Sequence, residues 1–222
     1  MARGILRAFR EMAGVEASSL AELTQTRPGR TLNVYDTQLP FYYHTCCYPL
    51  PDLLANAPGI EVQLSRFRPK DAPGSVIDGK PNVTNQNLEC LTFPDASFDL
   101  VMTSDVMEHV RLDHLAHQEI RRVLRPGGVY IFTVPHSRAM HETLHRVVVH
   151  DPADPSKDEY VLEKEYHGDA NDEDNAALSY RVYGTELDET LQSLGFQVEF
   201  TRQDFPDNGI VNTELFYCRL PL

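Results

Sequence analysis

The chain has 222 residues, of which 41% are hydrophobic and 24% are charged, the balance of an ordinary globular domain. A compact chain of this length buries on the order of 70% of the surface that the unfolded chain exposes, so a single domain over residues 1–222 requires neither disulfides nor a structural metal. The 20 basic and 33 acidic residues give a net charge of −13, which argues against nucleic acid as a partner.

The four cysteines include no C-x-x-C pair and suggest no disulfide framework, so we expect the reducing environment of the cytoplasm. The first residues lack the continuous apolar run of a secretion signal. No uncharged apolar stretch is long enough to span a bilayer, so no membrane span is expected.

Two helices are predicted within residues 1–30. The apolar residues of the first recur at helical spacing: Ile5, Leu6, Phe9 and Met12. This pattern favours a packing element, and an apolar face of this kind is also able to form a homodimer contact. In the second helix, Ser19 and Glu22 have the spacing of a capping box.

The first two strands are predicted at residues 31–36 and 60–65, with a short helix over 51–59 between them. Residues 66–81 contain three prolines and two glycines, which predicts an irregular loop.

The middle of the chain has the most regular pattern. A short strand near Val83 is followed by an apolar strand over 97–105, and the apolar stripe of residues 112–124 predicts a helix. The turn residues 125–128 end this helix, and residues 129–135 form a further apolar strand. A strand, a helix and a strand with short connections predict parallel pairing, and therefore an α/β sheet.

A helix is predicted over residues 137–149, followed by an acidic insertion over 151–180. Residues 151–175 hold ten acidic residues and two lysines, a net charge of −8, which is typical of a solvated loop or lid. The remaining predicted elements are a helix capped by Thr185 and ended by Gly195, and strands over 197–201 and 212–219.

The stretch LTFPDASFDLVMTSDVMEHV, a helix and then VLRPGGVYIFTVP resemble the second half of a class I S-adenosylmethionine (SAM)-dependent methyltransferase over residues 87–135. The resemblance implies a Rossmann-like α/β fold, with a seven-stranded, mostly parallel sheet, an antiparallel last strand and helices on both faces. It also implies SAM as the cofactor. The positions assigned to cofactor binding are Asp36, Asn87, Leu88, Ser104, Asp105 and Val106.

The first cofactor motif of this family is degenerate here. Relatives carry a glycine-rich loop after the first strand, because only glycine lets the backbone approach the cofactor so closely, yet no glycine occurs between Gly29 and Gly59. At the end of the second strand, relatives carry an acid that accepts hydrogen bonds from the ribose hydroxyls. Ser65, Arg66 and Phe67 stand there, and a guanidinium cannot accept a hydrogen bond.

Two functions therefore compete. In the first, the chain transfers a methyl group from SAM to a hydroxyl or similar nucleophile of a small molecule or glycan precursor. In the second, it is a catalytically inactive methyltransferase-fold protein that binds another ligand or a protein partner. Aromatic residues near the first motif either stack on a ligand or fill the vacated cofactor space: Tyr35, Phe41, Tyr42, Tyr43 and Tyr48.

Three histidines are candidate general bases, because imidazole exchanges its proton near neutral pH. His109 follows the fourth strand, and His136 follows the fifth, at the edge where open α/β sheets bind ligands. His167 lies in the acidic insertion, which as a lid would bring it to the acceptor. The structural alternatives are a cap or packing contact with the following helix for His109 and a turn stabilised by Asp169 for His167, whereas His136 is a candidate by its position alone.

Asp105, Glu108 and His109 are candidate ligands of a divalent metal. Their D-x-x-E-H spacing is similar to the E-x-x-E-H of ubiquinone-pathway O-methyltransferases and small-RNA 2'-O-methyltransferases, in which these positions hold a metal beside the acceptor hydroxyl. His136 is a candidate further ligand. The alternative is a buried helix start with a hydrogen-bonded carboxylate. A second half-site is interpreted as pocket lining or core: His44, Cys46 and Cys47.

Overall fold

The structure, a computed structural model, describes residues 1–37, 54–169, 172–205 and 210–222. Residues 51–53 of the predicted helix over 51–59 lie outside these ranges, and so do His44, Cys46, Cys47 and the aromatic residues Phe41, Tyr42, Tyr43 and Tyr48. No helix in the described ranges is both long and apolar enough to cross a membrane.

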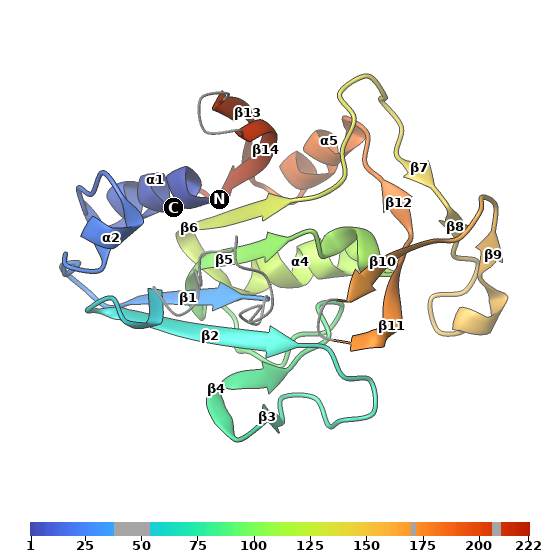
Figure 1. Cartoon of the computed structure of the whole chain (residues 1–222), viewed down its shortest axis with the longest axis horizontal. Helices are drawn as coiled ribbons and strands as arrows, with labels where there is room; N and C mark the ends of the chain where they lie inside the picture. Colours follow the sequence, from blue (N-terminus) through green and yellow to red (C-terminus); the bar gives the residue numbers. More distant parts are fainter. Residues whose placement is uncertain (38–53, 170–171, 206–209) are drawn as a thin grey trace.

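The centre of the molecule is one large sheet in the strand order β13-β14-β6-β5-β1-β2-β4-β3 (Figure 1). Strands β4, β2, β1, β5 and β6 are parallel to their neighbours in this series, whereas β14 pairs antiparallel with both β6 and β13. The strands are β1 (Leu32–Asp36), β2 (Ile60–Arg66), β3 (Val76–Ile77), β4 (Lys80–Asn85), β5 (Phe98–Ser104), β6 (Leu124–Thr133), β13 (Gln197–Phe205) and β14 (Ile210–Arg219).

Helices cover both faces of the sheet because side chains alternate along each strand. One face packs against α1 (Ala2–Ala13) and α2 (Leu20–Leu23), and the other against α4 (Asp113–Val123) and α5 (Glu186–Ser193). Neighbours along β5 show the alternation: Leu100 and Met102 belong to the first core, Val101 to the second. The predicted fold is confirmed, and β3 adds a short eighth strand inside the expected loop over 66–81.

The apolar face of α1 is buried in the chain's own core, where Ile5 and Phe9 have no exposed surface. This face is therefore not available for the homodimer contact considered from the sequence. The Ser19 hydroxyl accepts a hydrogen bond from the Glu22 amide, as predicted, but the Glu22 carboxylate accepts from Ser18.

The predicted helix over 137–149 is wrong. Residues there form β7 (Leu144–His145), which pairs with β12 (Arg181–Val182), and β8 (Val147–Val148), which pairs with β9 (Glu159–Tyr160). The backbone amide of Arg146 donates to the Tyr180 carbonyl, and the Arg146 carbonyl accepts from the Val161 amide. Its backbone hydrogen bonds are therefore made with distant segments and not within a helix. Consecutive valines also disfavour a helix because their branched side chains lose rotamer freedom there.

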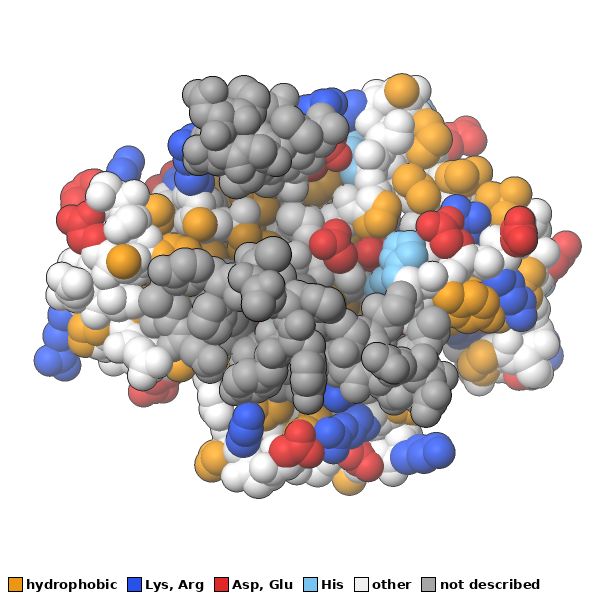
Figure 2. Space-filling view, viewed as in Figure 1, with side chains coloured by type: hydrophobic (Ala, Val, Ile, Leu, Met, Phe, Trp, Pro, Cys, Tyr) orange, Lys and Arg blue, Asp and Glu red, His pale blue; other side chains and the backbone are white. Residues whose placement is uncertain are grey.

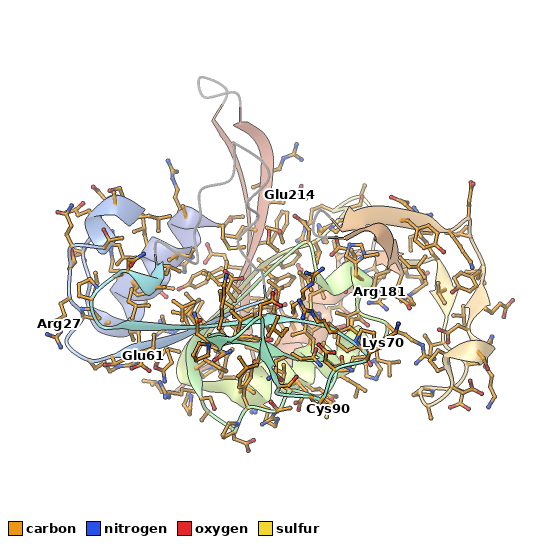
Figure 3. The ribbon with its side chains drawn as sticks, turned by 60° about the horizontal axis from the view of Figure 1, so that its bottom comes forward. Arg27, Glu61, Lys70, Cys90, Arg181 and Glu214 are labelled. Carbon is orange, nitrogen blue, oxygen red and sulfur yellow. The ribbon has the colours of Figure 1, made fainter. Side chains whose placement is uncertain are left out.

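The described residues of the acidic insertion form short strands and a turn that extend from the domain (Figure 1). It contains the 3-10 turn η2 (Pro155–Lys157) and a hairpin of β10 (Glu165–Asp169) and β11 (Asp172–Ser179). Beyond it, α5 ends before Gly195, which has φ +90° as a left-handed residue, but the Thr185 side chain makes no capping hydrogen bond. The following β13 and β14 hairpin projects from the sheet (Figure 3).

Candidate active site

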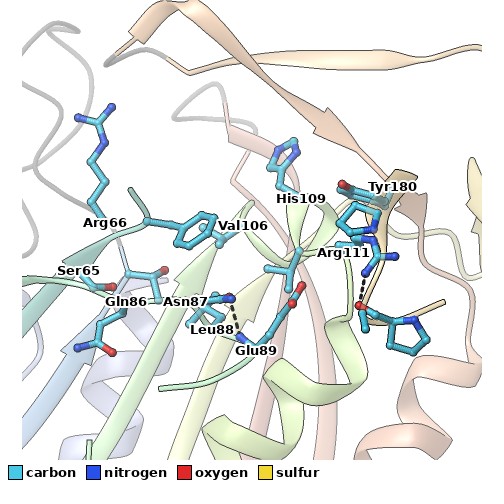
Figure 4. Close-up of a pocket in the computed structure, with 16 residues that line it drawn as sticks. Ser65, Arg66, Gln86, Asn87, Leu88, Glu89, Val106, His109, Arg111 and Tyr180 are labelled. Atoms are coloured by element: carbon cyan, nitrogen blue, oxygen red, sulfur yellow. Dashed lines mark hydrogen bonds between the residues drawn. The ribbon is translucent and has the colours of Figure 1, made fainter. Parts of the chain in front are cut away.

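A cavity of about 490 Å³ lies at the carboxyl ends of β2 and β4 and beside the segment after β5 (Figure 4). Ligands bind at this edge in open α/β sheets because the loops that leave the strands converge there. The lining residues that carry the argument below are Arg66, Asn87, Leu88, Val106, His109 and Arg111.

Amide side chains organise the cavity wall after β4. Asn85 is buried and binds the backbone of the preceding loop, accepting from the Arg68 amide and donating to the carbonyls of Asp71 and Ala72. The Asn87 side-chain oxygen accepts from the Glu89 amide at 3.0 Å. An amide oxygen has two lone pairs, so Asn87 keeps the capacity to accept a second hydrogen bond.

The predicted cofactor residues separate into two groups. Asn87, Leu88 and Val106 line the cavity, whereas Asp36, Ser104 and Asp105 are not among its lining residues. Asp36 is buried at the end of β1, and Thr37 lines the cavity in its place. The Ser104 hydroxyl is hydrogen-bonded to Thr133, and Asp105 is an exposed residue with φ +50°.

Two residues of the degenerate first motif are described. Arg66 lines the cavity at the end of β2, as its position in the sequence indicated. Tyr35 points into the core, where its ring lies 5.0 Å from Phe93 and its hydroxyl is hydrogen-bonded to Ser65 at 2.7 Å. Tyr35 therefore packs the sheet and does not fill the cofactor space.

The 3-10 turn η1 (Met107–His109) follows β5 and carries the most unusual side chain of the site. The Glu108 side chain is fully buried, and its carboxylate oxygens have no hydrogen-bond partner in any other described residue. Burial disfavours the charged form and raises the pKa of Glu108 to about 7. Burial also lowers the pKa of His109.

The insertion brings His167 to this turn. His167 Nδ1 lies 3.3 Å from His109 Nε2 and 3.9 Å from Glu108 Oε1, and His109 Nε2 lies 3.6 Å from Glu108 Oε1. We call these three residues the EHH cluster. Histidine side chains reach the surface between acidic ones on the face shown in Figure 2.

Two arginines that the sequence analysis missed fix the insertion to this turn. The buried Arg181 donates to the carbonyls of Val110 and Arg111 at 2.7 and 2.8 Å, and it lies where the insertion meets the sheet (Figure 3). Arg111 binds both carboxylate oxygens of Asp158 at 2.7 and 2.6 Å. Arg181 directly follows the acidic segment, which was the one signal in the sequence, whereas Arg111 lies 40 residues before Asp151.

Two predicted assignments are not supported by the geometry. Asp105 does not belong to the group of converging ligand atoms, in which His167 takes the third position. His136 neither lines the cavity nor joins the cluster. Its ring lies 5.1 Å from both Phe200 and Phe216, so β13 and β14 hold it on another part of the sheet edge.

The chain is similar in sequence to known methyltransferases. Residues 61–132 match a family model described as a methyltransferase domain. Over 133 residues the chain is 31% identical to a Mycolicibacterium smegmatis protein named "Probable S-adenosylmethionine-dependent methyltransferase", an alignment that covers 60% of this chain and 42% of that protein. The chain thus spans less than half the length of this relative.

Solved structures share the fold at low sequence identity. The [4+2]-cyclase SpnF has a TM-score of 0.53 at 13% identity, covering 91% of this chain and 79% of that chain. A SAM-dependent methyltransferase from Methanosarcina mazei has a TM-score of 0.50 at 15% identity, covering 87% and 94%. Because one of these proteins is named for a cyclisation, the shared fold alone does not establish the reaction.

Proposed function

We propose that this chain is a class I SAM-dependent methyltransferase and transfers a methyl group from SAM to a hydroxyl or similar nucleophile of a small molecule or glycan precursor. One observation supports the proposal above the others: His109 both lines the cavity at the strand ends and belongs to the EHH cluster. A cofactor pocket and a set of proton-accepting groups therefore share a wall.

The cavity residues fit the adenosyl part of SAM. The volume of the cavity lies in the range of small-molecule sites, about 300–1,000 Å³. Leu88 and Val106 offer apolar surface for the adenine ring, and the Asn87 oxygen can accept its amino group. Arg66 remains the departure from the family pattern, because an arginine cannot accept from the ribose hydroxyls.

SAM supplies a methyl carbon on a positively charged sulfur. In an in-line displacement the acceptor oxygen forms the new C–O bond, the C–S bond breaks with its electrons on sulfur, and the hydroxyl proton leaves. The protein must position the oxygen and remove that proton. Glu108, His109 and His167 are the groups beside the cavity that can do both.

A noncatalytic binding protein is the second candidate, and Arg66 in the cavity wall is the observation that favours it. In that case the cavity takes a ligand without adenosine. The cytoplasmic location remains a prediction.

Isothermal titration with S-adenosylhomocysteine separates the two candidates. We expect micromolar binding by the full chain, weakened at least tenfold by Val106→Trp, which fills the cavity. Val76→Trp is the matched control, because Val76 is exposed on β3 and is not among the cavity-lining residues. Absence of heat at millimolar ligand, from protein shown to be folded, would contradict methyl transfer and favour the binding protein.

A further inference from the structure

The EHH cluster has the dimensions of a metal site. Its three nearest nitrogen and oxygen atoms are 3.3, 3.6 and 3.9 Å apart, measured from His167 to His109, from His109 to Glu108 and from His167 to Glu108. Ligand atoms bound at about 2.1 Å and at tetrahedral angles are about 3.4 Å apart. The side chains thus need only small adjustments to share one ion.

Each histidine uses one ring nitrogen for a hydrogen bond to a group outside the cluster, which we call its outer hydrogen bond. The second ring nitrogen of each histidine then faces that of the other. His109 Nδ1 donates to the Leu178 carbonyl at 2.9 Å, which leaves a lone pair on Nε2. His167 Nε2 lies 3.2 Å from Glu165 Oε1 and donates to it, which leaves a lone pair on Nδ1. Metal-binding histidines typically donate their second N–H to a carbonyl or carboxylate in this way.

These outer contacts are themselves held in place. Glu165 also forms an ion pair with Arg146. The Glu108 carbonyl accepts from the amide of Tyr180, the residue that follows β11, at 2.8 Å, and β11 itself carries the Leu178 carbonyl. The cluster is therefore built into the junction between the insertion and the sheet.

The burial of Glu108 is a second observation that points to a bound cation, independent of the distances between the ligand atoms. A fully buried carboxylate without a hydrogen bond from another described residue is costly, because burial removes its hydration without replacement. The nearest partners are the two imidazole nitrogens, and both carry lone pairs when their outer hydrogen bonds are made. A cation between the three side chains would satisfy the carboxylate and both nitrogens together.

We propose that Glu108, His109 and His167 bind one divalent first-row transition-metal ion, of the Zn²⁺ or Co²⁺ type, whose open coordination positions take the hydroxyl oxygen of the acceptor. Two imidazoles and one carboxylate suit such ions, whereas Mg²⁺ and Ca²⁺ favour oxygen ligands. Three protein ligands are the number found in catalytic zinc sites, which keep a position open.

The role of the ion in the reaction rests on the proposed methyl transfer. An acceptor oxygen bound to a divalent ion loses its proton to water more readily, so the oxygen attacks the methyl carbon as an alkoxide while the C–S bond breaks. His109 and His167 then act as ligands and not as bases. Because His109 also lines the cavity, the acceptor oxygen would be held at the wall of the cofactor pocket.

The test is a titration of the full chain, stripped of metal by a chelator, with Co²⁺ followed by visible absorption and with Zn²⁺ followed by calorimetry. We expect one ion per chain, and at least hundredfold weaker binding in both Glu108→Gln and His167→Gln. The matched control is His150→Gln, because His150 also faces a carboxylate, Glu159 at 2.8 Å, but lies outside the cluster. Circular dichroism checks that each variant is folded.

Failure to take up one equivalent in the wild type would overturn the site. So would unchanged binding in the two cluster variants, because the ion would then be held elsewhere. Thiocyanate, which enters open positions, should change the Co²⁺ spectrum, and an unchanged spectrum would overturn the acceptor position. Metal binding without S-adenosylhomocysteine binding would refute the methyl transfer and leave the metal site; the reverse result would refute only the metal site.

Discussion

The two sides of the candidate site are held by different kinds of contact. The cofactor side consists of the ends of strands that continue into the apolar core, where Met102 and Ile131 are almost fully buried. The proposed acceptor side depends on the insertion, which is attached by charged contacts such as Arg111 to Asp158 and Arg181 to the carbonyls of Val110 and Arg111. Apolar burial supports the first side, and a few directional polar contacts support the second.

This difference implies that the two sides respond separately to mutation. Removing apolar volume from the sheet should lower the stability of the whole domain, because both cores share the strands. Removing a polar contact at the junction should loosen the insertion and displace His167 while the sheet stays folded.

The largest expected effect comes from Phe132→Ala in the sheet. Phe132 has no exposed surface and stacks on Tyr130 and Phe216 at 4.5 and 4.7 Å. The lost contacts and the resulting cavity should lower the free energy of unfolding in urea by about 4 kcal/mol. A loss below about 1 kcal/mol would show that the sheet does not dominate the stability.

Arg181→Met should have the next largest effect. It leaves the carbonyls of Val110 and Arg111 without their donor, and Asp113 without the cation 3.2 Å away. We expect the free energy of opening at this junction to fall by about 3 kcal/mol, because breaking a buried polar network leaves buried groups without their partners. Hydrogen exchange should accelerate most at residues 177–183. Unchanged protection there would contradict the role given to Arg181.

His117 should make the stability depend on pH. It is buried beside Tyr130 and Phe132, and burial lowers its pKa to about 4 from the ordinary value near 6.5. The unfolded chain binds this proton first, so stability is complete above pH 6.5 and falls as the pH decreases toward 4. The loss between pH 7 and 5 should be about 2 kcal/mol.

Urea unfolding at several pH values measures this loss. His117→Phe should remove that part of the pH dependence, while the exposed His150→Phe should keep it. Equal pH dependence in wild type and His117→Phe would contradict the assignment.

The smallest effect is expected from the ion pair of Arg111 and Asp158. A double-mutant cycle with alanine at both positions should give a coupling of about 1 kcal/mol in the opening of the insertion, with little change in global unfolding. Hydrogen exchange of residues 150–165 is the measurement. Lys157 and Asp151, a more exposed pair at 2.6 Å, serve as the control and should couple more weakly.

The sheet could be predicted where the pattern of apolar residues within a single segment is enough to identify the element. The strand over 97–105 and the helix over 112–124 appear as β5 and α4 with ends shifted by a residue. The residues predicted as a turn, 125–128, belong instead to β6, where Gly127 has φ +79°, a conformation that glycine adopts at little cost. Burial on both sides of a parallel strand leaves a continuous apolar run that is visible without any partner.

The insertion could not be predicted because distant residues determine its structure. β7 and β8 pair with segments that begin 11 or more residues away in sequence, so the helical pattern over 137–149 was misleading. His109 and His167 were each predicted as candidate bases, but their contact joins residues 58 positions apart. Arg181 resembles any surface cation until the fold buries it against carbonyl groups.

The most direct test is diffraction at the zinc edge from crystals grown with Zn²⁺ and S-adenosylhomocysteine. We expect one anomalous peak bonded to Glu108, His109 and His167, with adenosine density against Leu88 and Val106 in the adjoining cavity. An anomalous peak at other side chains, or a cavity without the nucleoside, would contradict a metal-assisted methyl transfer at this site.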